Sequence, residues 1–207
     1  MTDPNMKKLY LMRHGETLFN VQHKIQGWCD SPLTENGKQQ ALKAKEYFKK
    51  NGIVFDHAYC STSERASDTL ELITDLPYTR LKGLKENNYG VLEGESEIIN
   101  RHLTPKECET FYLQYGGESS NTTKDRMLTT LTEIMEKEDH ETVLAVSHAG
   151  ACYNFMRAIT DPSDEPKKVL ATVVSLYMNM ISIGSSSKKS SDRNKTDPYA
   201  MQVTQRI

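Results

Sequence analysis

The chain lacks an excess of charge of either sign. Its 207 residues carry 26 lysines and arginines against 28 aspartates and glutamates, a formal net charge of −2 at pH 7. A balance so close to zero provides no long-range field that would attract nucleic acid or an anionic membrane surface. We therefore expect no nucleic-acid partner and no membrane partner. An anion site in this protein has to be built from a few local cations.

Cysteine is scarce and scattered. The four cysteines are Cys29, Cys60, Cys108 and Cys152, and no two of them form a CxxC pair. No Cys/His spacing matches a zinc site either. The sequence therefore predicts neither a structural metal nor a disulfide framework.

Long apolar runs are absent as well. Nowhere do about 18 apolar residues follow one another, as a membrane-spanning helix requires. The amino-terminal stretch MTDPNMKKLYLM has no extended apolar segment after its lysines, unlike a secretory signal. We expect a reduced, cytoplasmic protein whose residues 1–207 form one domain.

Short apolar runs alternate with amphipathic segments along the chain. Strands are expected at 8–12, 53–61 and 142–147, with one or two more in 169–184. Helices are expected between Thr34 and Gly52, from a cap at Thr62 or Ser63 to Pro77, around 127–135 and over 149–160. This alternation predicts an α/β fold with three layers, in which helices flank a mostly parallel central sheet on both faces.

Two stretches depart from the alternation. Residues 87–120 are polar and rich in glycine, with a weak helical pattern around ECETFYLQY, and are interpreted as a lid insertion. Residues 184–197 are rich in Ser, Lys and Asp and predict a flexible loop before a last strand at 199–203.

Polar side chains follow the predicted strands directly. They are His14, Arg65, Glu86 and His148, with Arg13 beside the first. In an open parallel sheet the ligand lies at the carboxyl ends of the strands, so these groups are expected at one rim. Two imidazoles, two guanidinium groups and one carboxylate suit a phosphoryl group.

Each of these residues fits a step of phosphoryl transfer. Arg13 and Arg65 offer paired donors for phosphate oxygens and disfavour protonation of His14, which keeps a nucleophilic lone pair available. His148, if protonated, adds a third cationic donor, and Glu86 is the carboxyl group available to protonate a leaving alkoxide.

Five segments in order resemble the histidine phosphatase superfamily, which also contains the cofactor-dependent phosphoglycerate mutases. They are RHGET, QGWCDSPLTENGKQQA, STSERASDT, GGES and VSHAG. The resemblance implies a phosphoglycerate mutase-like fold, with His14 as the phosphohistidine nucleophile and Arg13, Arg65 and His148 in its phosphate pocket. It also assigns Asn20, Gln26 and Gly27 to the pocket, although Asn20 has the alternative role of capping the chain locally.

The segment KENNYGVLEGES resembles the proton-donor region of the family and points to Glu86, with Glu93 as the competing assignment. The mutases carry an arginine after this glutamate and an arginine pair in the lid. This chain has Asn87 after Glu86 and no Arg-Arg pair, and so is more similar to the phosphatases. Arg101, His102 and Lys106 in the insertion could contact the remote end of a substrate or be ordinary solvated charges. Trp28 and Tyr89 could stack near the substrate or serve only in packing.

The sequence thus predicts a phosphomonoesterase that hydrolyses a small phosphorylated metabolite through a phosphohistidine, without a metal or organic cofactor. A phosphoglycerate mutase-like phosphotransferase and a non-catalytic phospholigand-binding protein are the alternatives. The identity of the metabolite is not encoded in these motifs, and a homodimer is left open.

Overall fold

The computed structural model describes residues 7–100, 102–160 and 173–177, and its strands form one five-stranded sheet. The strands are β1 (Lys8–Arg13), β2 (His57–Ser61), β3 (Tyr78–Leu81), β4 (Thr142–Ser147) and β5 (Val173–Tyr177), in the order β3-β2-β4-β1-β5. All neighbouring strands run parallel. β4 lies in the middle, as its nearly continuous apolar sequence TVLAVS requires of a strand covered on both faces.

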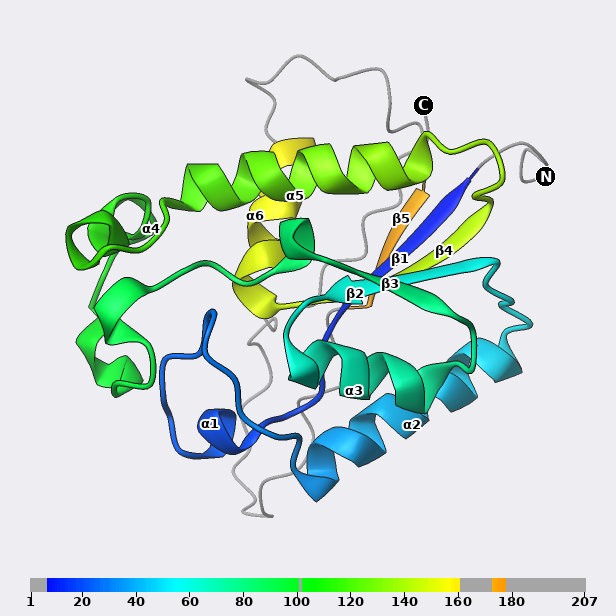
Figure 1. Cartoon of the computed structure of the whole chain (residues 1–207), viewed down its shortest axis with the longest axis horizontal. Coiled ribbons are helices and arrows are strands. Elements are labelled where there is room, and N and C mark those ends of the chain that lie inside the picture. Colours follow the sequence, from blue (N-terminus) through cyan, green and yellow to red (C-terminus); the bar gives the residue numbers. More distant parts are fainter. Residues whose placement is uncertain (1–6, 101, 161–172, 178–207) are drawn as a thin grey trace, which may run out of the picture.

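Helices cover both faces of this sheet, which confirms the predicted three-layer α/β fold (Figure 1). α2 (Glu35–Lys50) and α3 (Glu64–Ile73) lie on one face, and α5 (Ser120–Met135) and α6 (Ala149–Thr160) lie on the other. The strands supply one core on each side because successive side chains point to opposite faces. Leu9 and Leu11 pack with the α5 and α6 side, whereas Met12 and Val146 pack with the α2 and α3 side.

The helix starts follow local capping chemistry. The Thr34 hydroxyl accepts a hydrogen bond from the Gly37 N–H and begins α2, as predicted. Of the two candidates for α3, Ser63 occupies the cap position rather than Thr62. Gly37 is also where α2 touches the loop after β1, because a Cβ there would come within 2.1 Å of the Glu16 carbonyl oxygen.

The strand predicted at 53–61 is shorter in the structure, where β2 starts only at His57. The predicted start at residue 53 is therefore wrong. The Ile53 N–H bonds back to the Phe48 carbonyl at the end of α2, which keeps this part of the apolar run out of the sheet. Asp56 then ends the loop: its carboxylate accepts the backbone N–H groups of Glu141 and Thr142, at 3.0 and 2.6 Å. Ile53 and Phe55 pack into the core on the α2 and α3 side, whereas Val54 is exposed, so the apolar run in 53–55 does not reflect strand pairing.

The region 87–120, interpreted from its sequence as an insertion, contains little regular structure. It holds the short helix α4 (Pro105–Cys108) and the 3-10 turns η2 (Gly90–Leu92), η3 (Glu97–Asn100) and η4 (Phe111–Tyr115). With α1 (Leu18–Val21) these elements lie at one end of the sheet (Figure 1). Ile25, Leu92 and Tyr112 form a small separate core beneath them.

A further 3-10 turn, η1 (Lys82–Leu84), leads from β3 toward Glu86. Among the helices that the structure describes, none combines the length and apolar character needed to cross a bilayer. The predicted loop at 184–197 and the last strand at 199–203 lie outside the described residues.

Candidate active site

Two buried histidines meet at the carboxyl end of the sheet centre. His14 follows β1 and His148 follows β4, and these strands are paired with Arg13 opposite Ser147. The ring centroids are 5.2 Å apart with an interplanar angle of 62°. The sheet therefore brings together two imidazoles that are more than 130 residues apart in the chain.

The contacts of His14 fix its tautomer. Its Nδ1 lies 2.7 Å from the Gly15 carbonyl oxygen, and the Arg65 Nε–H donates to its Nε2 at 3.2 Å. A guanidinium group only donates hydrogen bonds, so Nε2 has to carry the lone pair and Nδ1 the proton. Burial, followed by the charges of Arg13 and Arg65, lowers the pKa of His14 well below 6.5. The ring is thus a neutral nucleophile with Nε2 as its reactive atom.

Arg65 binds both His14 and the loop at 27–30. Its side chain is 0% exposed and extends from the first turn of α3. Besides His14 it donates to the carbonyl oxygens of Gly27 (2.8 Å) and Cys29 (2.9 Å) and to Asp30 Oδ1 (2.9 Å). Four of the five N–H donors of a guanidinium group are used in this way. The sequence predicts that Arg65 binds oxygens of a phosphoryl group. The structure shows in addition that Arg65 anchors the loop at 27–30.

Three buried polar atoms at this site have no hydrogen-bond partner among the described residues. They are Arg13 Nε and both ring nitrogens of His148. Burying such groups without partners costs free energy, so they indicate a ligand that would accept from Arg13 Nε and from the protonated ring nitrogen of His148. Burial, followed by the charge of Arg65, lowers the pKa of His148 well below 6.5. His148 is therefore neutral near pH 7, not the cationic donor considered from the sequence, until a bound dianion raises its pKa.

Glu86 lies at the amino terminus of α6. Its carboxyl oxygens accept the backbone N–H groups of Asn87 (2.8 Å), Gly150 (2.8 Å) and Ala151 (2.7 Å). Burial raises the pKa of Glu86 from its ordinary value, against the opposing effect of the N–H groups and of Arg65 and Arg13. A raised pKa favours the protonated form that a general acid needs.

Glu93, the competing assignment, has a different environment. It accepts the backbone N–H groups of Gly27, Trp28, Cys29 and Tyr89 at 2.8 to 3.0 Å. Burial opposes ionisation, but hydrogen bonds from the Cys29 side chain and from these N–H groups lower the pKa of Glu93 overall. The geometry makes Glu93 an ionised structural acceptor and leaves Glu86 as the acid candidate.

Three residues assigned to the phosphate pocket from the sequence have local partners instead. The Asn20 side chain accepts from the Thr17 N–H and forms a capping box with Thr17 at the start of α1. Gln26 accepts from the Thr17 hydroxyl (2.6 Å) and donates to the Ser31 hydroxyl (2.9 Å). The Gly27 N–H is used by Glu93. Contact of Asn20, Gln26 and Gly27 with a phosphoryl group stays a prediction.

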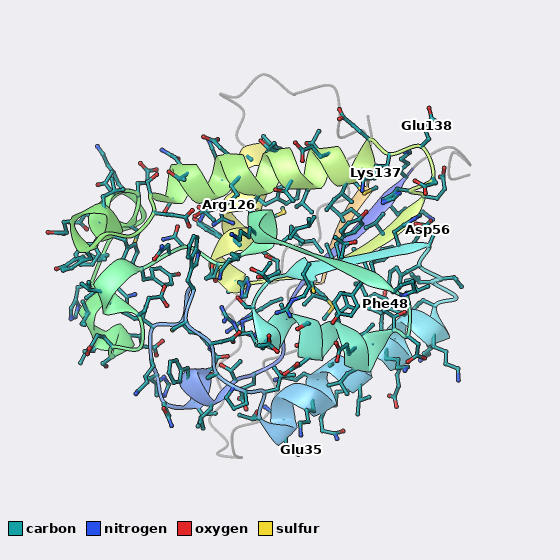
Figure 2. All side chains as sticks on the ribbon, in the orientation of Figure 1. Glu35, Phe48, Asp56, Arg126, Lys137 and Glu138 are labelled. Atoms are coloured by element: carbon teal, nitrogen blue, oxygen red, sulfur yellow. The ribbon has the colours of Figure 1, made fainter. Side chains whose placement is uncertain are left out.

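Arg126 supports the site from α5 without any signal in the sequence. Its guanidinium group donates to the carbonyl oxygens of Gly83 (2.9 Å) and Lys85 (2.8 Å), and to Glu118 Oε2 (2.9 Å), from the sheet-facing side of the helix (Figure 2). These bonds fix the segment that leads to Glu86. A single arginine beside an apolar helix stripe looks like a solvated charge, so no spacing argument could have identified it.

A second group of side chains carries metal-ligand types. His57, Asp139 and His140 have ligand atoms within 4.8 Å of one another. This group lies by Asp56 and Lys137, at the end of the sheet away from α4 (Figure 2). The His57 and His140 rings are stacked at 3.6 Å with an interplanar angle of 13°, so their lone pairs lie in two nearly parallel planes and do not point at one common atom between them. In this arrangement the residues do not form a metal centre.

Comparison with known proteins agrees with this geometry. The sequence profile of the histidine phosphatase superfamily, branch 1, matches residues 9–178. A 2,3-bisphosphoglycerate-dependent phosphoglycerate mutase from Hamiltonella defensa is 42% identical over 95 residues, covering 43% of this chain and 38% of that relative. This mutase and two further 2,3-bisphosphoglycerate-dependent mutases are matched over only 38 to 41% of their own length.

Two solved structures share the fold over most of the chain. Bacillus stearothermophilus YhfR is 30% identical with a TM-score of 0.65, covering 81% of this chain and 86% of that one. Phosphoserine phosphatase from Entamoeba histolytica, in complex with 3-phosphoglyceric acid, is 30% identical with a TM-score of 0.63, covering 74% and 80%. The superfamily resemblance inferred from the motifs is confirmed, and the neighbours include both phosphatases and mutases.

Proposed function

The chain belongs to the histidine phosphatase superfamily, and from this premise we propose that it is a phosphomonoesterase that acts through a phosphohistidine on His14. The observation that carries the proposal is the fixed tautomer of His14. Its Nε2 lone pair is held by Arg65 Nε at 3.2 Å, in a site where Arg13 Nε and the His148 ring lack partners. A phosphoryl group would supply acceptors for all three donor groups.

In the first step His14 Nε2 attacks phosphorus and the bond to the ester oxygen breaks. Arg13, Arg65 and His148 donate to the phosphoryl oxygens, where negative charge is concentrated in a loose transition state. The proton of Glu86 goes to the leaving oxygen, which departs as an alcohol.

In the second step water attacks the phosphorus of phosphohistidine. Glu86, now ionised, accepts a proton from the water as the new oxygen–phosphorus bond forms. The phosphorus–nitrogen bond breaks and its electron pair returns to Nε2. Inorganic phosphate leaves, and the starting protonation states of His14 and Glu86 are restored.

The mutase-like alternative draws support from the mutases to which the chain is similar over 95 residues. Against it, Asn87 follows Glu86, and its side chain bonds to the Thr123 hydroxyl (2.6 Å) and to the Glu118 carbonyl (3.3 Å). An amide held in this way adds no cation for a second acidic group of a substrate. Hydrolysis is therefore the better-supported reaction.

The experiment is covalent labelling with a radioactive phosphomonoester, compared among wild type, His14→Ala and His23→Ala. His23 is an exposed histidine paired with Glu97, and it provides the matched control. We expect acid-labile label and phosphate release from wild type and His23→Ala, and neither from His14→Ala. Labelling of His14→Ala at the wild-type level would remove His14 from this role.

Two further assays separate the alternatives. Turnover of 3-phosphoglycerate that depends on 2,3-bisphosphoglycerate would favour the mutase. A protein that leaves para-nitrophenyl phosphate intact while vanadate raises its melting temperature would be a binding protein.

A further inference from the structure

A cavity of about 750 Å³ adjoins the segment that holds Glu86. Gly150 and Asn87 line this cavity, and their backbone N–H groups donate to the two oxygens of the Glu86 carboxyl group, at 2.8 Å each. The remaining walls come from the insertion and from α6. A group that receives a proton from Glu86 would therefore extend from the phosphate site toward this space.

Aromatic rings form much of the wall. Tyr89, Tyr112 and Tyr153 all line the cavity, and the first two pack edge to face with ring centroids 4.6 Å apart. Tyr153 lies on α6 and is 50% exposed. Burial raises the pKa of Tyr89 well above 10, so its hydroxyl remains a neutral hydrogen-bonding group. The Tyr112 hydroxyl accepts a hydrogen bond from the Asn100 side chain at 2.9 Å and keeps its own proton to donate. Tyrosine faces with hydroxyl edges suit a ring that carries hydroxyl groups.

The charges of the wall largely cancel. Arg157 donates to Glu109 Oε1 at 2.9 Å and to Asn154 Oδ1 at 3.2 Å. Its charge is therefore already balanced, and Lys106 at the exposed edge is the remaining cation among the lining residues. A second phosphate or a carboxylate would normally be bound by several uncommitted cationic donors.

The size of the cavity is also informative. A volume of about 750 Å³ lies within the range of small-molecule sites, about 300–1,000 Å³. The alcohol part of a three-carbon acid would fill a small fraction of it, whereas a hexose or a nucleoside would fill much more.

We infer that this cavity binds the alcohol portion of the substrate, and that this portion is an uncharged, hydroxyl-bearing ring of the size of a hexose or nucleoside. The inference rests on the proposed function for the orientation of the substrate, with its phosphoryl group at His14. It names monophosphates of such rings as the substrate class, in place of small acidic phosphoesters such as 3-phosphoglycerate.

Calorimetric titration tests the inference separately from turnover. The probes are glucose 6-phosphate, adenosine 5′-monophosphate, 3-phosphoglycerate and inorganic phosphate, titrated into His14→Ala so that no ligand is consumed. Wild type is titrated with the corresponding phosphonates as a second measurement. We expect at least one ring monophosphate to bind about tenfold or more tightly than inorganic phosphate and 3-phosphoglycerate, a difference of about 1.4 kcal/mol. Equal or weaker binding of both ring ligands, or no binding at all, overturns the inference.

Two variants localise the binding. Tyr153→Ala should weaken binding of the preferred ring monophosphate about three- to tenfold. The affinity for inorganic phosphate should stay within about twofold of wild type. Leu113→Ala is the matched control, because Leu113 lies in the insertion, is 51% exposed and does not line the cavity. The same effect from both variants, or equal weakening of inorganic phosphate by Tyr153→Ala, would contradict the assignment.

A third variant tests the charge argument. Glu109→Gln removes the carboxylate charge that balances Arg157. The affinity for 3-phosphoglycerate should therefore rise several-fold, while the affinity for the ring monophosphate changes little. If the affinity for 3-phosphoglycerate is unchanged, the balanced charge of Arg157 is not the reason why the cavity prefers ring monophosphates. Tight binding of ring monophosphates without phosphate release by wild type would uphold the cavity inference and refute the hydrolase proposal.

Discussion

Arg65 Nε donates a hydrogen bond to the Nε2 atom of His14 at 3.2 Å. One contact therefore holds the ring, keeps its second nitrogen free of a proton and places a cation beside the point of attack. For the nitrogen–phosphorus bond to form, this N–H has to move from the lone pair to a phosphoryl oxygen. The positive charge stays close to the reacting atoms throughout, which is the requirement for stabilising a transition state by preorganised donors.

The first prediction concerns the pH dependence of hydrolysis. His14 is neutral above its depressed pKa, and Glu86 is protonated below its raised pKa. For an alkyl phosphate, kcat/KM should therefore fall as the pH rises through the pKa of Glu86, and this alkaline limb should disappear in Glu86→Gln. Para-nitrophenyl phosphate, whose leaving group needs no proton, should lack the limb. An equal limb for both substrates would argue against Glu86 as the acid.

The second prediction concerns stability at acidic pH. The pKa values of His14 and His148 are depressed in the folded state, so the unfolded chain binds protons that the folded chain does not. Stability is complete above the unfolded pKa near 6.5 and should fall by about 1.4 kcal/mol per pH unit for each histidine below it. Glu86 has the opposite effect, because its folded pKa is raised, but this effect is common to the proteins compared.

Urea unfolding from pH 7.5 to 5 measures this slope in wild type, His148→Gln and His102→Gln. His148→Gln should have a smaller slope than wild type by about the contribution of one histidine. His102 is exposed, and its variant should keep the wild-type slope. Identical slopes in all three proteins would mean that folding does not lower the pKa of His148.

The third prediction separates the two arginines of α3 and β3. Arg65→Lys should reduce the rate of phosphoenzyme formation by about 10² or more, as for the loss of a fixed oxyanion donor. It should also lower the melting temperature, because lysine cannot reproduce the fork that binds Gly27, Cys29 and Asp30 together. Arg80→Lys, an exposed arginine paired with Glu64, is the control and should change neither quantity appreciably. Rapid-quench labelling and thermal unfolding provide the two measurements, and a wild-type labelling rate in Arg65→Lys would refute the role.

The fourth prediction distinguishes the two carboxylates. Glu93→Gln should destabilise the protein by about 1–3 kcal/mol, because an amide replaces a charged acceptor of four backbone N–H groups. Its relative rates on alkyl and nitrophenyl phosphates should match wild type, unlike those of Glu86→Gln. Glu95→Gln, at an exposed position two residues further on, should leave both stability and rates unchanged. A leaving-group dependence that changes in Glu93→Gln but not in Glu86→Gln would reverse the assignment.

The strand ends could be predicted from the sequence because they depend on local patterns. TVLAVS is apolar without interruption and becomes the central strand, so the histidine after it has to lie at the rim. The start of α2 could likewise be predicted, because the Thr34 hydroxyl caps the N–H of Gly37 only three residues further on. Placing His14 and His148 together required no more than correct strand ends and parallel pairing.

The supporting residues could not be predicted because their partners are distant backbone atoms. Arg126 binds carbonyl groups about 40 residues away in the chain, and Glu93 binds N–H groups of the loop at 27–29. Backbone groups look the same for every residue type, so no side-chain pattern reveals them. The same limit applies to Gln26, whose hydrogen bonds to Thr17 and Ser31 depend on how the loop folds back.

The pairing of Arg13 with Ser147 on adjacent strands also determines how the site responds to heating. His14 and His148 extend directly from β1 and β4, so their spacing follows from the interstrand distance, about 4.8 Å, and not from loop conformation. Amide hydrogen exchange at these two strand ends can then occur only when the sheet itself separates, whereas the insertion around Tyr112 can open earlier because its core is small and separate. Substrate selection and chemistry would accordingly be lost at different temperatures, with selection lost first.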